Sequence, residues 1–212
     1  LTTRGKKVLL IDMDSQASLT ISAGIEPQDV ADNNIVSLLT DDEFHKNIED
    51  CIHQTADGKM DIIPSIIDLA NTEMRMLSRV SREKILDRQL SPIKENYDYI
   101  IIDCPPHLGI LTLNALSCAD GVIIPVKTDY LAYRGLTYLN DTIAEVKDYI
   151  NPNLQIYGII GTLHDKRAND DQQILNLIKK EYHVLAVVNK KVVAKKGVYK
   201  GLATVDLAPG SD

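Results

Sequence analysis

The chain has 212 residues, enough for one well-packed domain and at most two. It is 44% hydrophobic and 25% charged with a net charge of −7, which is ordinary for a globular protein and excludes a disordered or fibrous chain. No apolar run approaches the roughly 20 residues of a membrane span, and the three cysteines lack the CxxC spacing of a zinc or disulfide framework. We therefore expect a cytoplasmic protein.

Both ends of the printed sequence lead us to expect a fragment. Residues 1–5 are typical of the last turn of a helix, with polar and basic residues before Gly5 in the position that follows a helix end. A helix needs earlier residues, and the closing stretch VDLAPGSD contains no element that would complete a fold. We expect residues 1–212 to be a single domain that is part of a longer chain.

Apolar strands alternate with helical segments along the chain. In chain order we expect a strand at 7–12, short helices at 35–39 and 44–52, a strand at 60–64, a helix at 67–90 interrupted near 78–81, a strand at 99–103, a helix at 111–117, a strand at 121–126, a helix at 133–149, a strand at 155–161, a helix at 171–182 and a strand at 184–188. Strands that are apolar on both faces and separated by helices predict an α/β fold, a mostly parallel sheet covered by helices on both faces in Rossmann-type layering.

Charged residues follow three of the expected strands: Asp12 with Asp14, then Asp103, then Lys127. In open α/β sheets, ligands bind beyond the carboxyl ends of the strands, where these residues fall. Carboxylate oxygens suit Mg²⁺, which usually keeps several waters beside phosphate oxygens. An aspartate at a strand end is also a common helix cap or turn former, so one acid alone does not decide between the two readings.

The stretch YDYIIIDCPPHLG places Asp103 directly before a rigid turn. Pro105 and Pro106 cannot continue a strand ladder and stiffen the backbone that follows the acid. Gly109 is expected to allow a close approach of the backbone to a neighbouring group.

The late part of the chain is basic. Residues 163–200 hold nine lysines and arginines against four acids, a net charge of +5, which leaves −12 for the rest of the chain. Such a segment can bind nucleic acid, or it can be an ordinary solvated surface.

Three blocks of sequence carry a family resemblance. KKVLLIDMDSQASLT resembles switch I of the ParA-type (Soj-type) partition ATPases, members of the deviant Walker A P-loop family that includes MinD. YDYIIIDCPPHLGILTLNALSCADGVIIPVKTDYLAYRGL resembles their Walker B and switch II regions with the next strand and helix, and YGIIGTLHDKR resembles the strand that leads to a nucleotide-base pocket and a basic contact. The resemblance runs from Lys6 to about Tyr199 and implies a P-loop NTPase-like fold.

The resemblance also implies a glycine-rich phosphate loop, roughly 25 residues before the IDMDSQ block, whose backbone N–H groups and lysines cradle phosphates. No GxxxxGK[ST] pattern occurs in the 212 residues. We therefore expect this chain to lack the Walker A strand, loop and helix and the C-terminal helix, and to bind ATP poorly or not at all by itself.

ATP and Mg²⁺ are the cofactors that the resemblance implies for the intact protein. Asp103 would be the Walker B acid, bonded to a water on Mg²⁺. Asp14 would position the attacking water, and Asp12 would support the water shell of the cation. Pro105 and Thr162 are expected at the nucleotide.

The implied function is ATP-dependent DNA partitioning of a plasmid or chromosome. An ATP-dependent homodimer would bind DNA without sequence preference, release it on hydrolysis, associate with the nucleoid in the cytoplasm and act with a ParB-type centromere-binding partner. The expected DNA contacts are Arg167, Lys190, Lys191, Lys195 and Lys196. The family often has a proline and an arginine at the end of the strand expected at 184–188. This chain has VVNKK there, a departure that affects the expected base pocket and DNA contacts.

Three alternatives stay open at this point. A MinD-like, membrane-associated division-site regulator shares the ATPase core but needs a C-terminal amphipathic helix, and the lysine-rich segment favours DNA instead. A phosphoreceiver-like signalling domain would also use Asp12, Asp14, Asp103 and Lys127, but the 91 residues from Asp12 to Asp103 exceed the interval in a compact receiver, where the double proline has no role. The phosphoreceiver is the alternative that is not an ATPase, and a purely structural scaffold would be recognised by whether the intact protein hydrolyses ATP at all.

Overall fold

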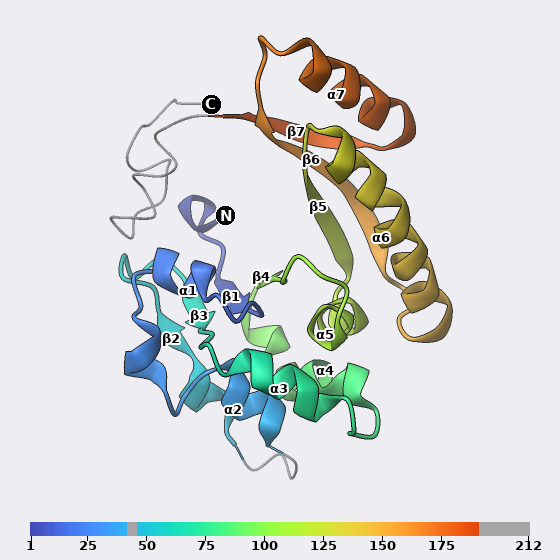
Figure 1. The fold of residues 1–212 in the computed structure, drawn as a ribbon. Helices are drawn as coiled ribbons and strands as arrows, with labels where there is room; N and C mark the ends of the chain where they lie inside the picture. Colours follow the sequence, from blue (N-terminus) through green and yellow to red (C-terminus); the bar gives the residue numbers. More distant parts are fainter. Residues whose placement is uncertain (42–45, 191–212) are drawn as a thin grey trace. The chain divides into compact units, whose positions relative to one another are not determined.

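The computed structural model describes residues 1–41 and 46–190. The chain divides into two compact units, the first formed by residues 1–118 and the second beginning at Ala119. Each unit has its own sheet, flanked by helices (Figure 1). This mostly parallel α/β architecture confirms the fold class expected from the sequence, whereas the single-domain organisation stays a prediction.

The first unit contains a four-stranded sheet with the order β2-β3-β1-β4. Its strands are β1 (Val8–Asp12), β2 (His53–Gln54), β3 (Asp61–Ile63) and β4 (Tyr99–Asp103). β1 is central and pairs in parallel with β3 and β4, while β2 runs antiparallel to β3. The register places Asp12 directly opposite Asp103, so the last residues of β1 and β4 are neighbours.

Short helices connect these strands, and η denotes a 3₁₀ helix. They are η1 (Thr2–Arg4), α1 (Ser18–Ser22), η2 (Pro27–Val30), α2 (Ile35–Thr40), η3 (Ile48–Cys51), α3 (Leu69–Met76), η4 (Arg82–Lys84), α4 (Ile85–Leu90), η5 (Lys94–Asn96) and α5 (Ile110–Cys118). Helices α2 to α5 pack against one face of the sheet, where Leu9, Ile11 and Ile63 are fully buried (Figure 1). α1 covers part of the other face, where Leu10 and Ile62 lie.

β4 departs from the expectation that its strand is apolar and buried on both faces. Ile100 and Ile102 pack against the helix-covered core, but Tyr99 is 46% exposed and Ile101 is 45% exposed. The reason is that α1 has only five residues and packs against β1, so it leaves this side of β4 open.

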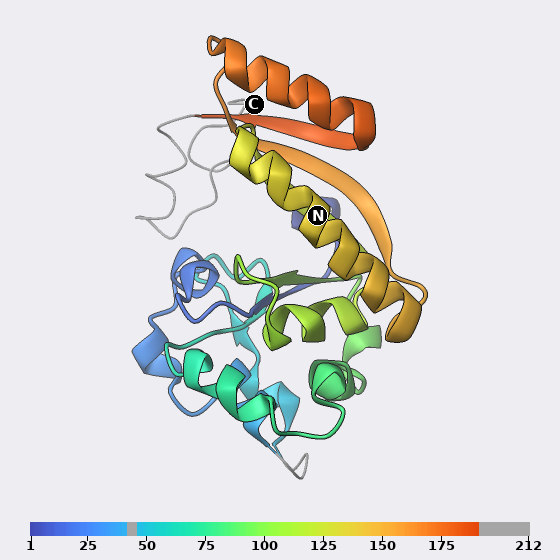
Figure 2. The ribbon, with the colours of Figure 1, turned by 45° about the vertical axis from the view of Figure 1, so that its right-hand side comes forward.

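The second unit is a three-stranded parallel sheet with the order β5-β6-β7. It follows the chain order β5 (Gly121–Lys127), α6 (Tyr130–Tyr149), β6 (Gln155–His164), α7 (Asn169–Glu181) and β7 (Val184–Asn189). Consecutive parallel strands joined by right-handed crossovers place their helices on the same face, and α6 and α7 lie side by side there (Figure 2). Leu136, Ile143, Ile159 and Ile178 are buried in its core.

The elements expected from the sequence agree with most of these bounds, although the short elements η2, β2 and η5 were not expected. The expected helix at 44–52 is wrong where it can be compared: Ile48–Cys51 is a single 3₁₀ turn capped by the Asn47 side chain, which accepts from the Glu49 N–H, and residues 42–45 lie outside the described ranges. α1 was not expected. The break near residue 80 is confirmed, since Ser81 has φ of 52° between α3 and η4. Within residues 1–41 and 46–190, no helix is both long and apolar enough to span a bilayer.

Core packing of the first unit gives a direct stability test. Leu9→Ala removes a fully buried side chain from the central strand, so it should lower the free energy of unfolding by about 2–5 kcal/mol through lost burial and a cavity. Ile67→Ala, at a side chain that is 73% exposed, should change it by about 0.5 kcal/mol or less. Urea denaturation followed by circular dichroism measures both, and equal effects would contradict this description of the core.

Candidate functional site

The residues singled out in the sequence fall in both units. The first unit holds the residues expected at the metal and the hydrolysed bond, namely Asp12, Asp14, Asp103 and Pro105. The second unit holds residues expected at the base or at DNA, namely Thr162, Arg167 and Lys190. The other expected DNA contacts, Lys191, Lys195 and Lys196, lie outside the described residues.

Three acids meet at the carboxyl end of the first sheet. Asp12 and Asp103 end adjacent parallel strands, and the N–H of Met13 donates to the backbone oxygen of Asp103 at 2.9 Å. Desolvation, followed by the negative charges of Asp12 and Asp14, raises the pKa of Asp103 above its ordinary value. The three carboxylates are therefore close enough to interact, as expected from the sequence, although Asp103 keeps an exposed side chain.

Asp12 is fully buried and held by hydrogen bonds within the chain. Its Oδ2 accepts from the N–H of Thr20 at 2.8 Å and from the Thr20 hydroxyl at 2.7 Å, while its Oδ1 accepts from the N–H of Asp14 at 3.1 Å. Burial raises the pKa of Asp12, and the bonds from Thr20 oppose that rise. The support that Asp12 is expected to give to a cation's water shell stays a prediction.

Asp14 lies two residues beyond the strand, half-buried, in a tight turn. Its Oδ1 accepts from the N–H of Gln16 at 3.0 Å, and its backbone oxygen accepts from the N–H of Ala17 at 2.9 Å. Ala17 has φ of 52°, a left-handed conformation that costs a residue with a Cβ about 1–2 kcal/mol. The second carboxylate oxygen of Asp14 accepts no hydrogen bond from the described residues, so it is able to orient a ligand.

The loop that follows Asp103 is packed closely against α3. Pro105 is buried, and the Nε2 of His107 lies 3.2 Å from Oε2 of Glu73. A Cβ at Gly109 would meet Oε1 of Glu73, so this glycine allows the Glu73 side chain to approach the backbone closely. Burial raises the pKa of the Cys104 thiol to about 12, so this cysteine is a poor nucleophile at neutral pH.

α5 is fixed behind this loop by a buried asparagine that the sequence analysis did not single out. Asn114 donates from Nδ2 to the backbone oxygens of Arg82 and Ile110, both at 2.8 Å, and its Oδ1 accepts from the N–H of Leu86 at 3.1 Å. The helix that carries the end of the loop is therefore tied to η4 and α4.

An open pocket of ≈ 360 Å³ adjoins Asp103 between α1 and β4. Its lining is apolar from Leu10, Leu19, Ile101 and Ile102, with hydroxyls from Ser18 and Ser22. A second pocket of ≈ 380 Å³, at Lys46, Glu49 and Ile93, includes none of the expected site residues. The chemistry of the first unit is thus concentrated around Asp103.

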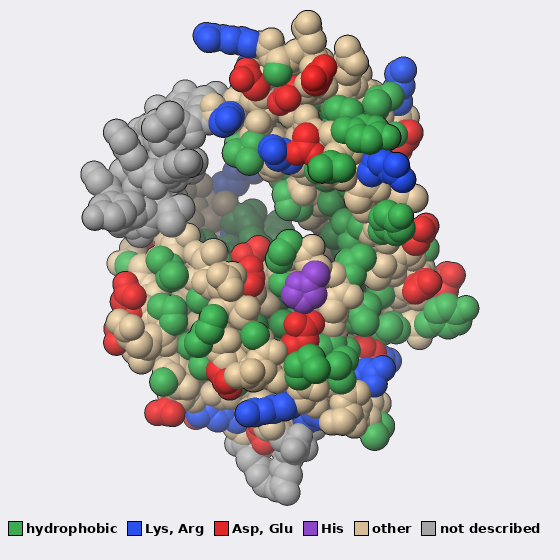
Figure 3. All heavy atoms as spheres, viewed as in Figure 1, with side chains coloured by type: hydrophobic (Ala, Val, Ile, Leu, Met, Phe, Trp, Pro, Cys, Tyr) green, Lys and Arg blue, Asp and Glu red, His purple; other side chains and the backbone are tan. Residues whose placement is uncertain are grey.

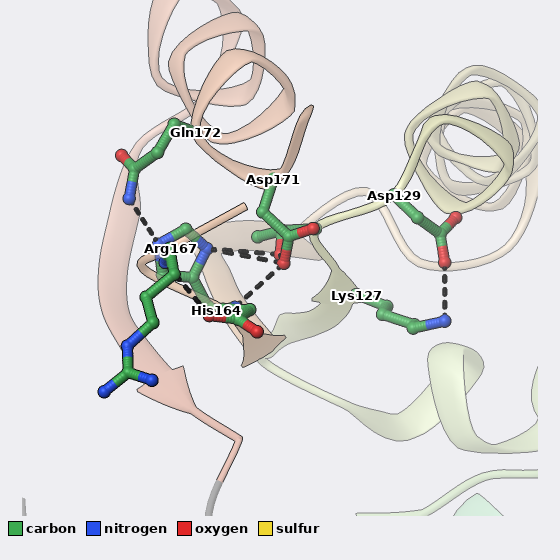
Figure 4. Close-up of polar contacts among 8 residues, drawn as sticks. Lys127, Asp129, His164, Arg167, Asp171 and Gln172 are labelled. Atoms are coloured by element: carbon green, nitrogen blue, oxygen red, sulfur yellow. Dashed lines mark hydrogen bonds and ion pairs between the residues drawn. The ribbon is translucent and has the colours of Figure 1, made fainter. Parts of the chain in front are cut away.

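In the second unit, a buried histidine organises the end of the sheet. His164 is 3% exposed, and its Nδ1 lies 3.2 Å from the Thr128 hydroxyl and 3.9 Å from Oδ2 of Asp171 (Figure 4). The same Asp171 oxygen accepts from the Thr128 hydroxyl at 2.9 Å and from the N–H of Asp165 at 2.8 Å. Sequence reasoning missed this cluster; its only signal is a histidine at a strand end, with acids in the following turn and helix.

Arg167 is presented by the turn that this cluster holds. Its N–H donates to Oδ1 of Asp165 at 2.9 Å, and its exposed side chain extends away from His164 and Asp171 (Figure 4). Lys190 is also exposed, and its N–H donates to the backbone oxygen of His164 at 3.0 Å. Of the two described residues that are expected to contact DNA, Arg167 is thus held by Asp165 and Lys190 by His164.

The other second-unit residues have more limited contacts. Thr162 is half-buried and pairs in register with Lys127, whose Nζ lies 3.0 Å from Oδ2 of Asp129 (Figure 4). Acidic, basic and hydrophobic side chains are interspersed on the face of this unit that the space-filling view shows (Figure 3). On that face of the described residues, the basic character of residues 163–190 does not form one continuous patch.

Known proteins are similar to this chain in sequence and in fold. A family model described as an AAA domain matches residues 1–156. The sporulation initiation inhibitor protein Soj of Bacillus subtilis is 42% identical over 178 residues, 84% of this chain and 69% of Soj. The chain belongs to the ParA/Soj-type family of partition ATPases. Across four curated relatives, the matched part makes up 53% to 69% of their own length.

Two solved structures support the family fold. A plasmid partition protein from Borrelia burgdorferi has a TM-score of 0.76 at 26% identity, covering 97% of this chain and 86% of that one. Cobyrinic acid a,c-diamide synthase from Mycobacterium smegmatis, with bound ATP analog and magnesium, has a TM-score of 0.82 at 33% identity, covering 94% and 80%. The P-loop NTPase-like fold expected for this ParA/Soj-type chain is confirmed.

The hydrogen bonds to Asp171 should make the free energy of unfolding depend on pH. The N–H of Asp165, followed by the Thr128 hydroxyl, holds the pKa of Asp171 below its ordinary value of 3.8. Because the folded pKa is depressed, the stabilisation is fully present above that ordinary value and is lost as the pH falls through the folded pKa. Asp171→Asn should therefore destabilise the protein at pH 7, and its difference from wild type should shrink below pH 3.8.

The matched control is Asp170→Asn, an exposed acid in the same first turn of α7, where the helix dipole acts equally on both residues. Urea denaturation at a series of pH values measures both variants. A stability loss for Asp171→Asn that is no larger at pH 7 than at pH 3, or that Asp170→Asn reproduces, would contradict the role of this cluster.

Proposed function

We propose that the intact protein is an ATP-dependent DNA-partitioning ATPase. The observation that carries the proposal is the convergence of Asp12, Asp14 and Asp103 at the carboxyl end of two adjacent parallel strands. Ligands of open α/β sheets bind at this edge. Phosphoryl transfer depends mainly on positioning and charge neutralisation, so a small set of rigidly mounted carboxylates is sufficient on the protein side.

The proposed cofactors are ATP and Mg²⁺, and the donor chemistry of the acidic edge fits them. The described residues contain no group of three or more His, Cys, Asp or Glu side chains arranged to hold a metal by themselves. Mg²⁺ is usually held by one or two carboxylates while waters and phosphate oxygens complete its shell. Burial, followed by the negative charges of Asp12 and Asp14, raises the pKa of Asp103, and a divalent cation would offset the negative charge gathered there.

Each acid has a distinct proposed role. Asp103, exposed at the end of β4, is proposed to bind a water of the metal shell, and Asp14, at the tip of its turn, to orient the attacking water. Asp12 is proposed to support the cation's water shell from its buried position. Asp103 and Asp12 are the residues that would hold Mg²⁺, which would supply charge neutralisation at the phosphate. Pro105 stiffens the loop beside Asp103, and Thr162 is proposed to lie at the nucleotide.

The proposed cycle uses DNA as a partner. An ATP-dependent homodimer would bind DNA without sequence preference through Arg167, Lys190, Lys191, Lys195 and Lys196, and hydrolysis, stimulated by a ParB-type partner, would release it. The proposed location of the protein is therefore the cytoplasm, on the nucleoid. Support comes from family membership and from the exposed, backbone-anchored positions of Arg167 and Lys190.

The acids can be separated by mutation in the intact protein. Asp14→Ala should lower the ATP hydrolysis rate by 10²-fold or more, of the order of losing one positioning group, while leaving the ATP dissociation constant nearly unchanged. Asp103→Ala should weaken Mg²⁺-dependent ATP binding itself, because it removes an anchor of the cation. Steady-state hydrolysis and calorimetry of ATP binding with and without Mg²⁺ measure these effects.

Asp87→Ala, at an exposed acid on α4, is the control and should match wild type in both assays. Equal, small losses for Asp14→Ala and Asp103→Ala would mean that neither carboxylate faces the nucleotide. An intact wild-type protein without ATP hydrolysis would favour a structural scaffold instead.

DNA binding can be tested through its dependence on salt. Each protein contact to a DNA phosphate releases counterions, so log affinity should fall by about 0.9 per log unit of salt for each contact. Arg167→Ala should lower affinity for DNA of any sequence and reduce the salt slope by about one contact. The combined charge reversal of Lys190, Lys191, Lys195 and Lys196 to glutamate should abolish binding while leaving DNA-independent hydrolysis intact.

Arg134→Ala is the matched control, since Arg134 is an exposed arginine of the same unit on α6. Binding is measured by fluorescence anisotropy with two unrelated duplexes between 50 and 200 mM salt, the range in which the effect is large. Wild-type affinity and slope in the charge-reversed variant would make the basic segment a solvated surface and favour a MinD-like membrane function, which vesicle binding would then reveal.

A further inference from the structure

Thr20 lies at the centre of a buried polar chain that joins three separate segments. Its hydroxyl donates to Oδ2 of Asp12 at 2.7 Å and accepts from the N–H of Ser65 at 2.9 Å. Its own N–H donates to the same Asp12 oxygen at 2.8 Å. Thr20, Asp12 and Ser65 are each 0% exposed. The end of β1, the middle of α1 and the segment after β3 are thus tied at one point.

The same set of buried hydrogen bonds extends from Asp12 to Asp14. The two carboxylate oxygens of Asp12 have different partners. Oδ2 accepts both hydrogen bonds from Thr20, and Oδ1 accepts from the N–H of Asp14. On either side of Asp14, the N–H of Met13 bonds to Asp103 and the N–H of Ala17 closes the turn. The Asp14 backbone is therefore fixed by the Asp12 carboxylate, whose orientation is set in turn by Thr20.

We propose that Thr20 is a positioning residue for hydrolysis: through Asp12 it holds the backbone of Asp14 so that the Asp14 carboxylate is aimed at the attacking water. The inference rests on the function proposed above. Thr20 touches neither nucleotide nor metal in this scheme, because its hydroxyl is fully used inside the fold. Ser65 contributes its N–H alone; its hydroxyl has no hydrogen-bond partner among the described residues.

The first test is Thr20→Val in the intact protein, which keeps the shape of the side chain and removes the hydroxyl. Hydrolysis per bound ATP should fall roughly 10- to 100-fold, as expected when a reacting group is misplaced by about 1 Å, while the ATP dissociation constant stays within about threefold of wild type. Thr20→Ser, which keeps the hydroxyl, should restore most of the rate.

Two controls match this variant. Thr72→Val makes the same change at a side chain that is also 0% exposed, but whose hydroxyl donates only within its own helix, to the Asp68 backbone oxygen at 3.2 Å. Ser65→Ala removes a hydroxyl next to the site while keeping the N–H that Thr20 uses. Neither should change the rate beyond its effect on stability.

Amide hydrogen exchange provides a readout that needs no nucleotide. In wild type, the amides of Asp14, Thr20 and Ser65 should be protected and should exchange together, and Thr20→Val should speed exchange at Ser65 and Asp14 while Thr72→Val does not. Fast, independent exchange of these amides in wild type overturns the proposal, and this measurement stands even if Thr20→Val does not fold.

The outcomes also separate this inference from the function on which it rests. Wild-type ATP hydrolysis with an unchanged rate in Thr20→Val refutes the positioning role alone. Absence of hydrolysis in intact wild type refutes the proposed function, even where the exchange data agree with the buried chain.

Discussion

The first unit is organised around one buried carboxylate. An ionised group removed from water is unfavourable unless hydrogen bonds replace its hydration, and Asp12 has no solvent exposure. Three donors from Asp14 and Thr20 satisfy it. To deliver them, the chain turns sharply after β1, with Ala17 in the left-handed region, and starts α1 at once. The hydrogen bonds that the buried Asp12 carboxylate needs thus determine the conformation of the segment that carries Asp14.

The second unit also contains a hydrogen-bonded carboxylate at the end of its sheet, but this carboxylate lies on the helix and not on the strand. There the carboxylate comes from the first turn of a helix, at Asp171, and reaches back to the ends of β5 and β6 through Thr128 and the N–H of Asp165. In both units, one acid ties a strand end to the loop and helix that follow it. Loops at the carboxyl edge of a parallel sheet carry the binding groups, so rigid loops of this kind are what precise positioning requires.

Sequence patterns were sufficient for the strands and long helices because burial of apolar side chains decides those elements. The same logic failed for α1, whose formation depends on the polar contact between Thr20 and Asp12 across eight residues, and for residues 48–51, where the Asn47 cap selects a 3₁₀ turn. The acids could be placed at one sheet edge from strand order alone. Their division into buried Asp12 and exposed Asp103 could not, since it depends on which side chains α1 covers.

Similarity in fold and sequence says more about the nucleotide-binding scaffold than about what each protein acts on. A cobyrinic acid a,c-diamide synthase is 33% identical to this chain and a plasmid partition protein is 26% identical, yet both share its fold with TM-scores above 0.75. Similarity in the core therefore does not separate the two functions, as is common for P-loop-type scaffolds that accept different sites. What can separate them lies on the surface: an exposed Arg167 held on a turn by Asp165, and an exposed Lys190 anchored to His164. Their backbones are held by hydrogen bonds inside the second unit, which leaves both charged side chains at the surface, where a change of residue costs the core little.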